Sequence, residues 1–225
     1  MSIIRNLYDA VYNNLIGGGA YLRIIKGCIF TVLIFVLALC IALLFAAGLS
    51  FLRTAESKGL RAIGTGITFL AKGTPIYLAL LLWYYTFLGE LHRGGLLIAV
   101  CVFGFYGGGH LADILSRAVK KEVSTRSAVV NRRARREFFS ALLPFVTEQS
   151  LFEIKRLVCI LLQMSSLVGI VGVNDVAQVL LENGLRTQYP FFALFCGVIF
   201  YLLLQLFIEL IFARVGKALT GEEEE

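Results

Sequence analysis

Five long apolar runs dominate this sequence of 225 residues. A helix rising about 1.5 Å per residue needs roughly 20 apolar residues to cross a bilayer core of about 30 Å. The runs that meet this requirement lie near residues 29–52, 63–88, 95–113, 157–177 and 190–213. Because backbone amides in lipid must be hydrogen-bonded within the protein, each run is predicted to be helical. We therefore predict an all-α polytopic membrane protein with about five transmembrane helices.

The segments outside these runs divide the chain further. Apolar residues recur at helical spacing through the first sixteen positions, which predicts an interfacial amphipathic helix within residues 1–20. Residues 21–219 are then a single transmembrane domain. Four consecutive glutamates close the segment 220–225, which we expect to be a solvated, disordered tail. The alternative is that this tail shields basic residues on the same side of the membrane.

A basic loop, residues 116–156, carries ten of the 21 Lys and Arg residues and four glutamates, an excess equal to the whole net charge of +6. The rest of the chain is balanced, which argues against a nucleic-acid partner. Lys and Arg accumulate on the cytoplasmic side of membrane proteins. With this loop inside, fifteen basic residues lie on the cytoplasmic side and five outside. The prediction is an N-terminus outside and a C-terminus in the cytoplasm.

No enzyme chemistry is expected from this chain. Its five cysteines lie in or beside apolar runs without a Cys-x-x-Cys pair, and His92 and His110 have no acidic or Cys residues at ligand spacing. We predict no disulfide, metal or cofactor. A Gly-x4-Gly-Lys-Ser/Thr phosphate loop is absent from the sequence as well, so the chain is not expected to hydrolyse ATP.

The second apolar run is interrupted by Lys72-Gly73-Thr74-Pro75. A charge, a flexible residue and a helix breaker together predict two shorter helices in place of one. Broken helices in membranes tend to line water-filled pathways, because the freed backbone groups need polar partners. Lys72 and Thr74 are therefore candidate substrate-path residues. Alternatively, Lys72 snorkels to the membrane surface and Pro75 only kinks a lipid-facing helix.

Polar side chains also interrupt the fourth run. Gln163, Ser165 and Ser166 either face a polar substrate or hydrogen-bond across the helix bundle, while Gly169 and Gly172 permit close helix approach.

In the third run, three successive glycines precede His110 and Asp113. The glycines are interpreted as sites of tight helix packing. A gate formed by the two ionisable residues is the alternative.

In their order and spacing these patterns resemble the permease subunits of polar amino-acid ABC importers. Gly27 with Thr31 looks like the Gly and Thr that open the first span of this family, and 72–75 looks like its Arg-Gly-Thr-Pro. Asp113 falls where the family has a Glu. The stretch 161–175 is similar to its Leu-Leu-Lys-Asp-Thr-Ser-Leu followed by Ile-Gly-Val and an acidic residue. The resemblance covers about residues 27–217 and implies the type I importer fold.

The resemblance also assigns a role to the basic loop. In this family the loop before the fourth span holds the EAA signature, whose coupling helices dock on an ATPase. Its frame fits here when Leu143-Pro144 takes the place of its closing Leu-Pro, with Asn131 for the usual Gly and Thr125-Arg126-Ser127 for Glu-Ala-Ala. The chemistry of the signature has thus largely been replaced. The implied coupling residues are Arg126, Asn131, Arg132, Arg133, Arg135, Arg136, Phe138, Phe139 and Pro144. From the residues alone, a loop held against anionic lipid headgroups is the alternative, and both roles are compatible.

The function implied by the resemblance is transport of a polar amino acid across a bacterial inner membrane. The partners would be cytosolic ATPase subunits, a second permease chain, an external substrate-binding protein and membrane lipid. Two alternatives stay open. One is a diverged scaffold or regulatory subunit that does not transport, which the replaced EAA residues favour. The other is an ATP-independent channel in which Lys72 attracts anions.

Overall fold

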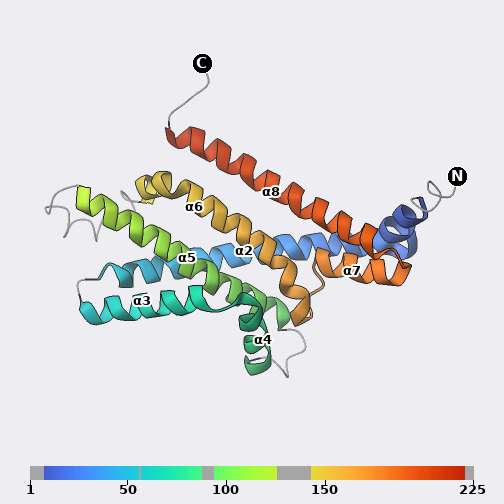
Figure 1. Cartoon of the computed structure of the whole chain (residues 1–225), viewed down its shortest axis with the longest axis horizontal. Coiled ribbons are helices and arrows are strands. Elements are labelled where there is room, and N and C mark those ends of the chain that lie inside the picture. Colours follow the sequence, from blue (N-terminus) through green and yellow to red (C-terminus); the bar gives the residue numbers. More distant parts are fainter. Residues whose placement is uncertain (1–7, 56, 88–93, 126–142, 221–225) are drawn as a thin grey trace, which may run out of the picture. The chain divides into compact units, whose positions relative to one another are not determined.

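The computed structural model describes residues 8–55, 57–87, 94–125 and 143–220, and all regular structure within them is helical (Figure 1). After a helical turn at residues 8–11 the elements are η1 (Tyr12–Ile16, a π-helix), η2 (Gly17–Gly19, a 3₁₀ helix), α2 (Ala20–Arg53), α3 (Lys58–Gly73), α4 (Ile76–Phe87), α5 (Gly95–Thr125), α6 (Leu143–Met164), η5 (Ser165–Val171, a 3₁₀ helix), α7 (Val176–Thr187) and α8 (Pro190–Thr220).

Four described helical segments are long and apolar enough to cross a membrane, or five spans if the pair α3 and α4 counts as one broken span. This agrees with the predicted all-α membrane fold. The helices extend beyond the apolar runs, because α2 begins at Ala20 instead of near residue 29 and α5 continues to Thr125 instead of 113. The extensions contain charged residues of good helix propensity, Arg23 and Lys26 in the first and Arg117, Lys120, Lys121 and Glu122 in the second.

The fourth span also differs from its prediction. The α-helix α6 ends at Met164 and continues as the 3₁₀ helix η5, which Gly172 terminates with φ +75°. No heavy atom lies within 4 Å of a Cβ built on Gly172, whereas a Cβ on Gly169 would lie 2.5 Å from the Gln178 amide oxygen. Gly169 therefore permits close packing, as expected, while Gly172 supplies a left-handed helix end.

The predicted interruption of the second run is a true helix break. Helix α3 ends at Gly73, Thr74 has extended backbone angles (φ −80°, ψ 123°), and α4 begins at Ile76. The residue before a proline is forced out of the helical region, which explains the conformation of Thr74. Pro75 itself fits the start of α4, where a missing N–H costs nothing, and its carbonyl accepts a hydrogen bond from the Ala79 amide at 3.0 Å.

The chain divides into two compact units. The first contains residues 1–38, 75–103 and 161–206, and the second contains 39–74, 104–160 and 207–225. Helices α2, α5, α6 and α8 each contribute to both.

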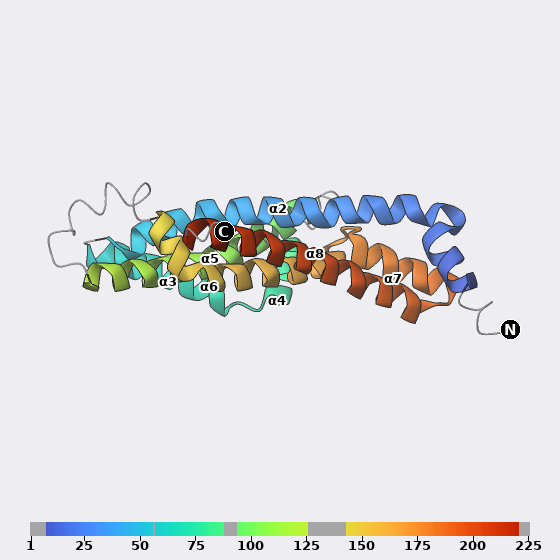
Figure 2. The ribbon, with the colours of Figure 1, turned by 90° about the horizontal axis from the view of Figure 1, so that it is seen from above.

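In the first unit, α7 packs against the segment before α2. The Thr187 hydroxyl donates to Asn14 Oδ1 at 2.8 Å, and Asn183 donates to the Asn14 carbonyl at 3.5 Å. Asn14 itself is fully buried. Tyr8, Tyr12 and Ile16 on the same segment are well exposed, in keeping with an apolar face turned to a membrane surface. Figure 2 shows α7 lying alongside the first part of α8.

In the second unit, glycines bring α5 close to its neighbours. A Cβ on Gly108 would lie 2.8 Å from the Phe45 side chain, and one on Gly109 would lie 2.5 Å from the Ala71 Cβ. Tight packing is thus the role of these two glycines. The Phe105 ring of α5 also packs against the Phe45 ring of α2, with ring centroids 5.0 Å apart.

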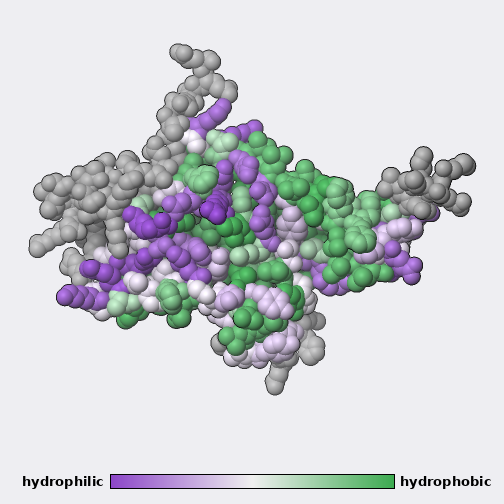
Figure 3. Space-filling model, in the orientation of Figure 1, coloured by the Kyte–Doolittle hydropathy of each residue, from purple (hydrophilic) through white to green (hydrophobic). Residues whose placement is uncertain are grey.

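Helix α8 displays apolar side chains around most of its circumference, and Figure 3 shows green hydrophobic surface over much of it. Only 11% of its most apolar window is buried within the chain. Such a helix requires an apolar surrounding, either lipid or another protein.

Candidate functional site

A buried polar network in the first unit connects three helices. The Thr31 hydroxyl of α2 donates to the Gly27 carbonyl at 3.0 Å and accepts from the Val176 amide at 3.1 Å. Gly27 permits this contact, because a Cβ there would lie 3.0 Å from the Asp175 backbone. These two residues thus dock α2 onto the start of α7.

Asp175 is the N-cap of α7 and is fully buried. Its carboxylate accepts hydrogen bonds from the Gln178 amide at 3.0 Å, the Ala177 amide at 3.2 Å and the Tyr201 hydroxyl of α8 at 3.1 Å. Burial raises the pKa of this carboxyl above its usual value, and the same hydrogen bonds oppose the rise. Asp175 therefore fixes α7 relative to Tyr201.

Tyr201 also lines an open cavity of about 340 Å³ in the first unit. The wall is formed by residues of α6, η5, α7 and α8, most of them apolar: Gln163, Ser166, Ala177, Leu180, Leu194, Gly197, Val198, Tyr201, Leu202 and Gln205. This volume is that of a small-molecule site. None of the lining residues carries a formal charge, so the cavity suits a ligand group that is itself uncharged.

The polar part of the cavity contains a pair of glutamines. Gln163 Nε2 donates to Gln205 Oε1 at 3.1 Å and so connects α6 with α8. The Ser166 hydroxyl donates to the Gln163 carbonyl at 2.7 Å. The structure therefore places two predicted path residues, Gln163 and Ser166, at one cavity. Ser165 is instead fully buried, with its hydroxyl donating to the Leu162 carbonyl.

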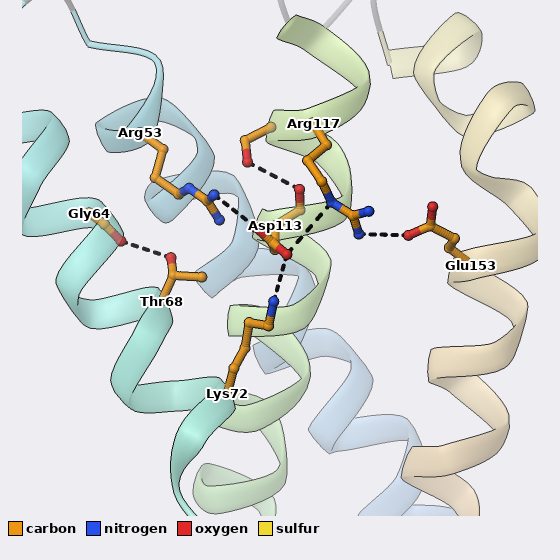
Figure 4. A network of polar contacts seen from close by, with 8 residues as sticks. Arg53, Gly64, Thr68, Lys72, Asp113, Arg117 and Glu153 are labelled. Carbon is orange, nitrogen blue, oxygen red and sulfur yellow. Dashed lines mark hydrogen bonds and ion pairs between the residues drawn. The ribbon is translucent and has the colours of Figure 1, made fainter. Parts of the chain in front are cut away.

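The second unit contains a cluster of charged side chains centred on Asp113 of α5 (Figure 4). Its carboxylate lies 2.8 Å from Arg53 Nη2 of α2, 2.6 Å from Lys72 Nζ of α3 and 3.6 Å from Arg117 Nε one helical turn along α5. Arg117 also lies 2.7 Å from Glu153 of α6. Three basic and two acidic groups thus join four helices.

The cluster gives Lys72 an ion-pair partner, so Lys72 is not an isolated charge. Its ammonium group is neutralised by Asp113, and its side chain is about one-third exposed. Thr74 lies two residues further on, where its hydroxyl donates to the Leu70 carbonyl. His110 is not hydrogen-bonded to Asp113. The centroid of its ring lies 4.5 Å from that of the Tyr106 ring, and its buried Nε2 has no hydrogen-bond partner among the described residues.

Most of the predicted coupling residues lie outside the described residues: Arg126, Asn131, Arg132, Arg133, Arg135, Arg136, Phe138 and Phe139. Pro144 is the second residue of α6, a first-turn position that proline tolerates well. The docking role of this loop remains a prediction.

No protein-family model matches the chain, and no curated protein matches it in sequence. The fold does match a solved structure, the crystal structure of an amino acid ABC transporter with histidines. The TM-score is 0.73 at 16% identity, over 87% of this chain and 94% of the other. This chain shares the fold of that structure.

The resemblance to permease subunits of amino-acid ABC importers implied this fold, and that prediction is confirmed. The resemblance also singled out Gly27 and Thr31, which the structure places in direct contact with the start of α7.

Sequence reasoning missed Gln205, Tyr201, Arg53 and Glu153 as site residues. Gln205 had a detectable signal, because it stands alone between leucines in the apolar run of α8. The other three residues carried no such signal. Arg53 and Glu153 were counted only as charges on the cytoplasmic side, and Tyr201 is one of many aromatic residues in the apolar runs.

Proposed function

We propose that this chain is the membrane subunit of an ABC importer and forms the translocation path for a polar amino acid. The observation that carries the proposal is the amino acid ABC transporter fold over nearly the full length of both chains. The cavity beside Gln163 and Ser166 supports it, because it is of small-molecule size and is lined by residues of α6, η5, α7 and α8.

ATP hydrolysis would take place on separate cytosolic subunits, since this sequence lacks a phosphate loop. A second permease chain would complete the path, and an external binding protein would deliver the substrate. The protein would lie in a bacterial inner membrane with its N-terminus outside and its C-terminus in the cytoplasm.

Coupling would run through the basic loop. Helices α5 and α6 border residues 126–142, and the Arg117–Glu153 ion pair ties these two helices together. Asp113 extends that connection to Arg53 and Lys72. A displacement of the loop by an ATPase would therefore reach α2 and α3 through side chains already in contact.

A scaffold or regulatory subunit is the second candidate, favoured by the replacement of the EAA residues by Thr125-Arg126-Ser127. The channel alternative receives less support, because Lys72 forms an ion pair with Asp113 and is not an isolated charge.

The deciding experiment is purification of the chain from its native membrane, followed by reconstitution with whatever copurifies. An importer requires a copurifying ATPase and uptake of an amino acid into vesicles that depends on ATP. If no ATPase copurifies and the vesicles show no ATP-dependent uptake, the importer proposal fails and the scaffold or regulatory subunit is favoured. Solute flux independent of ATP would contradict both and revive the channel.

A further inference from the structure

The glutamine pair in the first unit offers a specific pattern of hydrogen-bonding groups. In the described part of the chain, the amide side chains of Gln163 and Gln205 form one hydrogen bond, from Gln163 Nε2 to Gln205 Oε1. That bond leaves the Gln163 amide oxygen as an acceptor and the Gln205 amide nitrogen as a donor. Both side chains line the open cavity and are at least partly exposed.

We propose that this cavity binds the primary carboxamide group of a small molecule. A carboxamide presents an N–H₂ donor and a carbonyl acceptor side by side, which complements the free acceptor of Gln163 and the free donor of Gln205. The apolar wall contributed by Leu180, Val198 and Leu202 would cover the short hydrocarbon part of the ligand. The inference rests on the proposed function, and it narrows the polar amino acid to one with a carboxamide side chain, whose α-ammonium and α-carboxylate groups would lie outside this charge-free cavity.

The chemistry of the cavity distinguishes this ligand from its close relatives. A carboxylate has no donor for Gln163, and the lining offers no cation to compensate its charge. An N,N-dialkyl amide accepts from Gln205 but cannot donate to Gln163. A purely apolar group, such as a lipid chain, leaves both amides without a new partner.

A different role for the glutamine pair would be a simple clamp between α6 and α8, since amides commonly join helices in membranes. A clamp makes no distinction among ligands. The two roles are therefore separable by binding measurements, without reference to transport.

The test is saturation-transfer difference NMR on the full-length chain in lipid nanodiscs, with butanamide as the probe. Sodium butanoate and N,N-dimethylbutanamide are matched in carbon skeleton but lack the required donor. We expect transfer to butanamide at least fivefold greater than to either analogue. Equal transfer to all three compounds would overturn the proposal and leave an apolar cavity with a helix clamp.

Three variants locate the binding. Gln205→Leu removes the donor and should weaken butanamide binding by roughly fivefold, the factor that one net hydrogen bond provides. Gly197→Leu fills the cavity without removing either amide, and a Cβ at Gly197 meets only ordinary contact with Leu180 at 3.5 Å. It should abolish binding. The matched control is Gln178→Leu on α7, which removes an amide that bonds Glu182 outside the cavity and should leave binding unchanged.

Circular dichroism establishes whether each variant is folded. If the Gln205→Leu protein does not fold, the Gly197→Leu protein still provides the test. Butanamide binding that persists in the folded Gly197→Leu protein would overturn the assignment to this cavity. Failure of the importer proposal would be recognised separately, as absence of ATP-dependent uptake by the reconstituted complex whatever the NMR result.

Discussion

The ammonium nitrogen of Lys72 lies 2.6 Å from a carboxylate oxygen of Asp113, a residue 41 positions away in sequence. Arg53 bonds the other carboxylate oxygen at 2.8 Å. One acidic side chain therefore forms ion pairs with cations on two other helices. In a membrane protein this matters more than at a water-exposed surface, because an unpaired charge near lipid is costly.

Asp113→Asn is expected to destabilise the protein by about 3 kcal/mol, since it leaves Arg53 and Lys72 close together without their shared counter-charge. Denaturant unfolding in detergent micelles measures the change. Glu153→Gln is the matched control, because its pair with Arg117 is about half exposed and should contribute less than about 1 kcal/mol. Equal effects of the two substitutions would contradict a central role for Asp113.

Gly109→Ala should destabilise the second unit, because the added Cβ would lie 2.5 Å from that of Ala71. The expected cost is about 1–3 kcal/mol, typical of overpacking. Gly66→Ala on α3 is the control, since no heavy atom lies within 4 Å of the position its Cβ would take. There the better helix propensity of Ala should raise stability by up to about 1 kcal/mol. Thermal unfolding of both variants measures these changes: the melting temperature should fall for Gly109→Ala and rise for Gly66→Ala.

Thr31→Val should destabilise the contact between α2 and α7. The substitution keeps the shape of the side chain but removes the acceptor for the buried Val176 amide. Leaving that N–H without a partner should cost about 1–3 kcal/mol. Thr31→Ser retains the hydroxyl and should be close to wild type in an unfolding experiment. If Val and Ser behave alike, the hydrogen bond contributes nothing measurable.

The raised pKa of Asp175 makes stability depend on pH in a definite direction. A carboxyl whose folded pKa exceeds its unfolded value stabilises the fold below the unfolded pKa of about 4, and that contribution is lost as pH rises through the folded pKa. Asp175→Asn keeps an N-capping side chain and removes the titration. The melting temperature of the wild type should therefore fall relative to that of the variant as pH rises from about 4 toward neutrality. A difference between the two proteins that does not change with pH would contradict this account.

The sequence by itself determined the fold class and the approximate position of every span, because the length of an apolar run needed to cross lipid is fixed by helix geometry. It also located the break at Thr74-Pro75, since proline restricts the backbone of its predecessor whatever surrounds it.

Only the tertiary structure decided which polar groups act together. Lys72 pairs with Asp113 of another helix, and Ser165, which the sequence groups with Ser166, is buried against its own helix. Gln163 and Gln205, which are 42 positions apart in sequence, form a hydrogen bond between α6 and α8. Such contacts depend on how the helices rotate and pack, and that information is spread over all the side chains between them, not contained in any local motif.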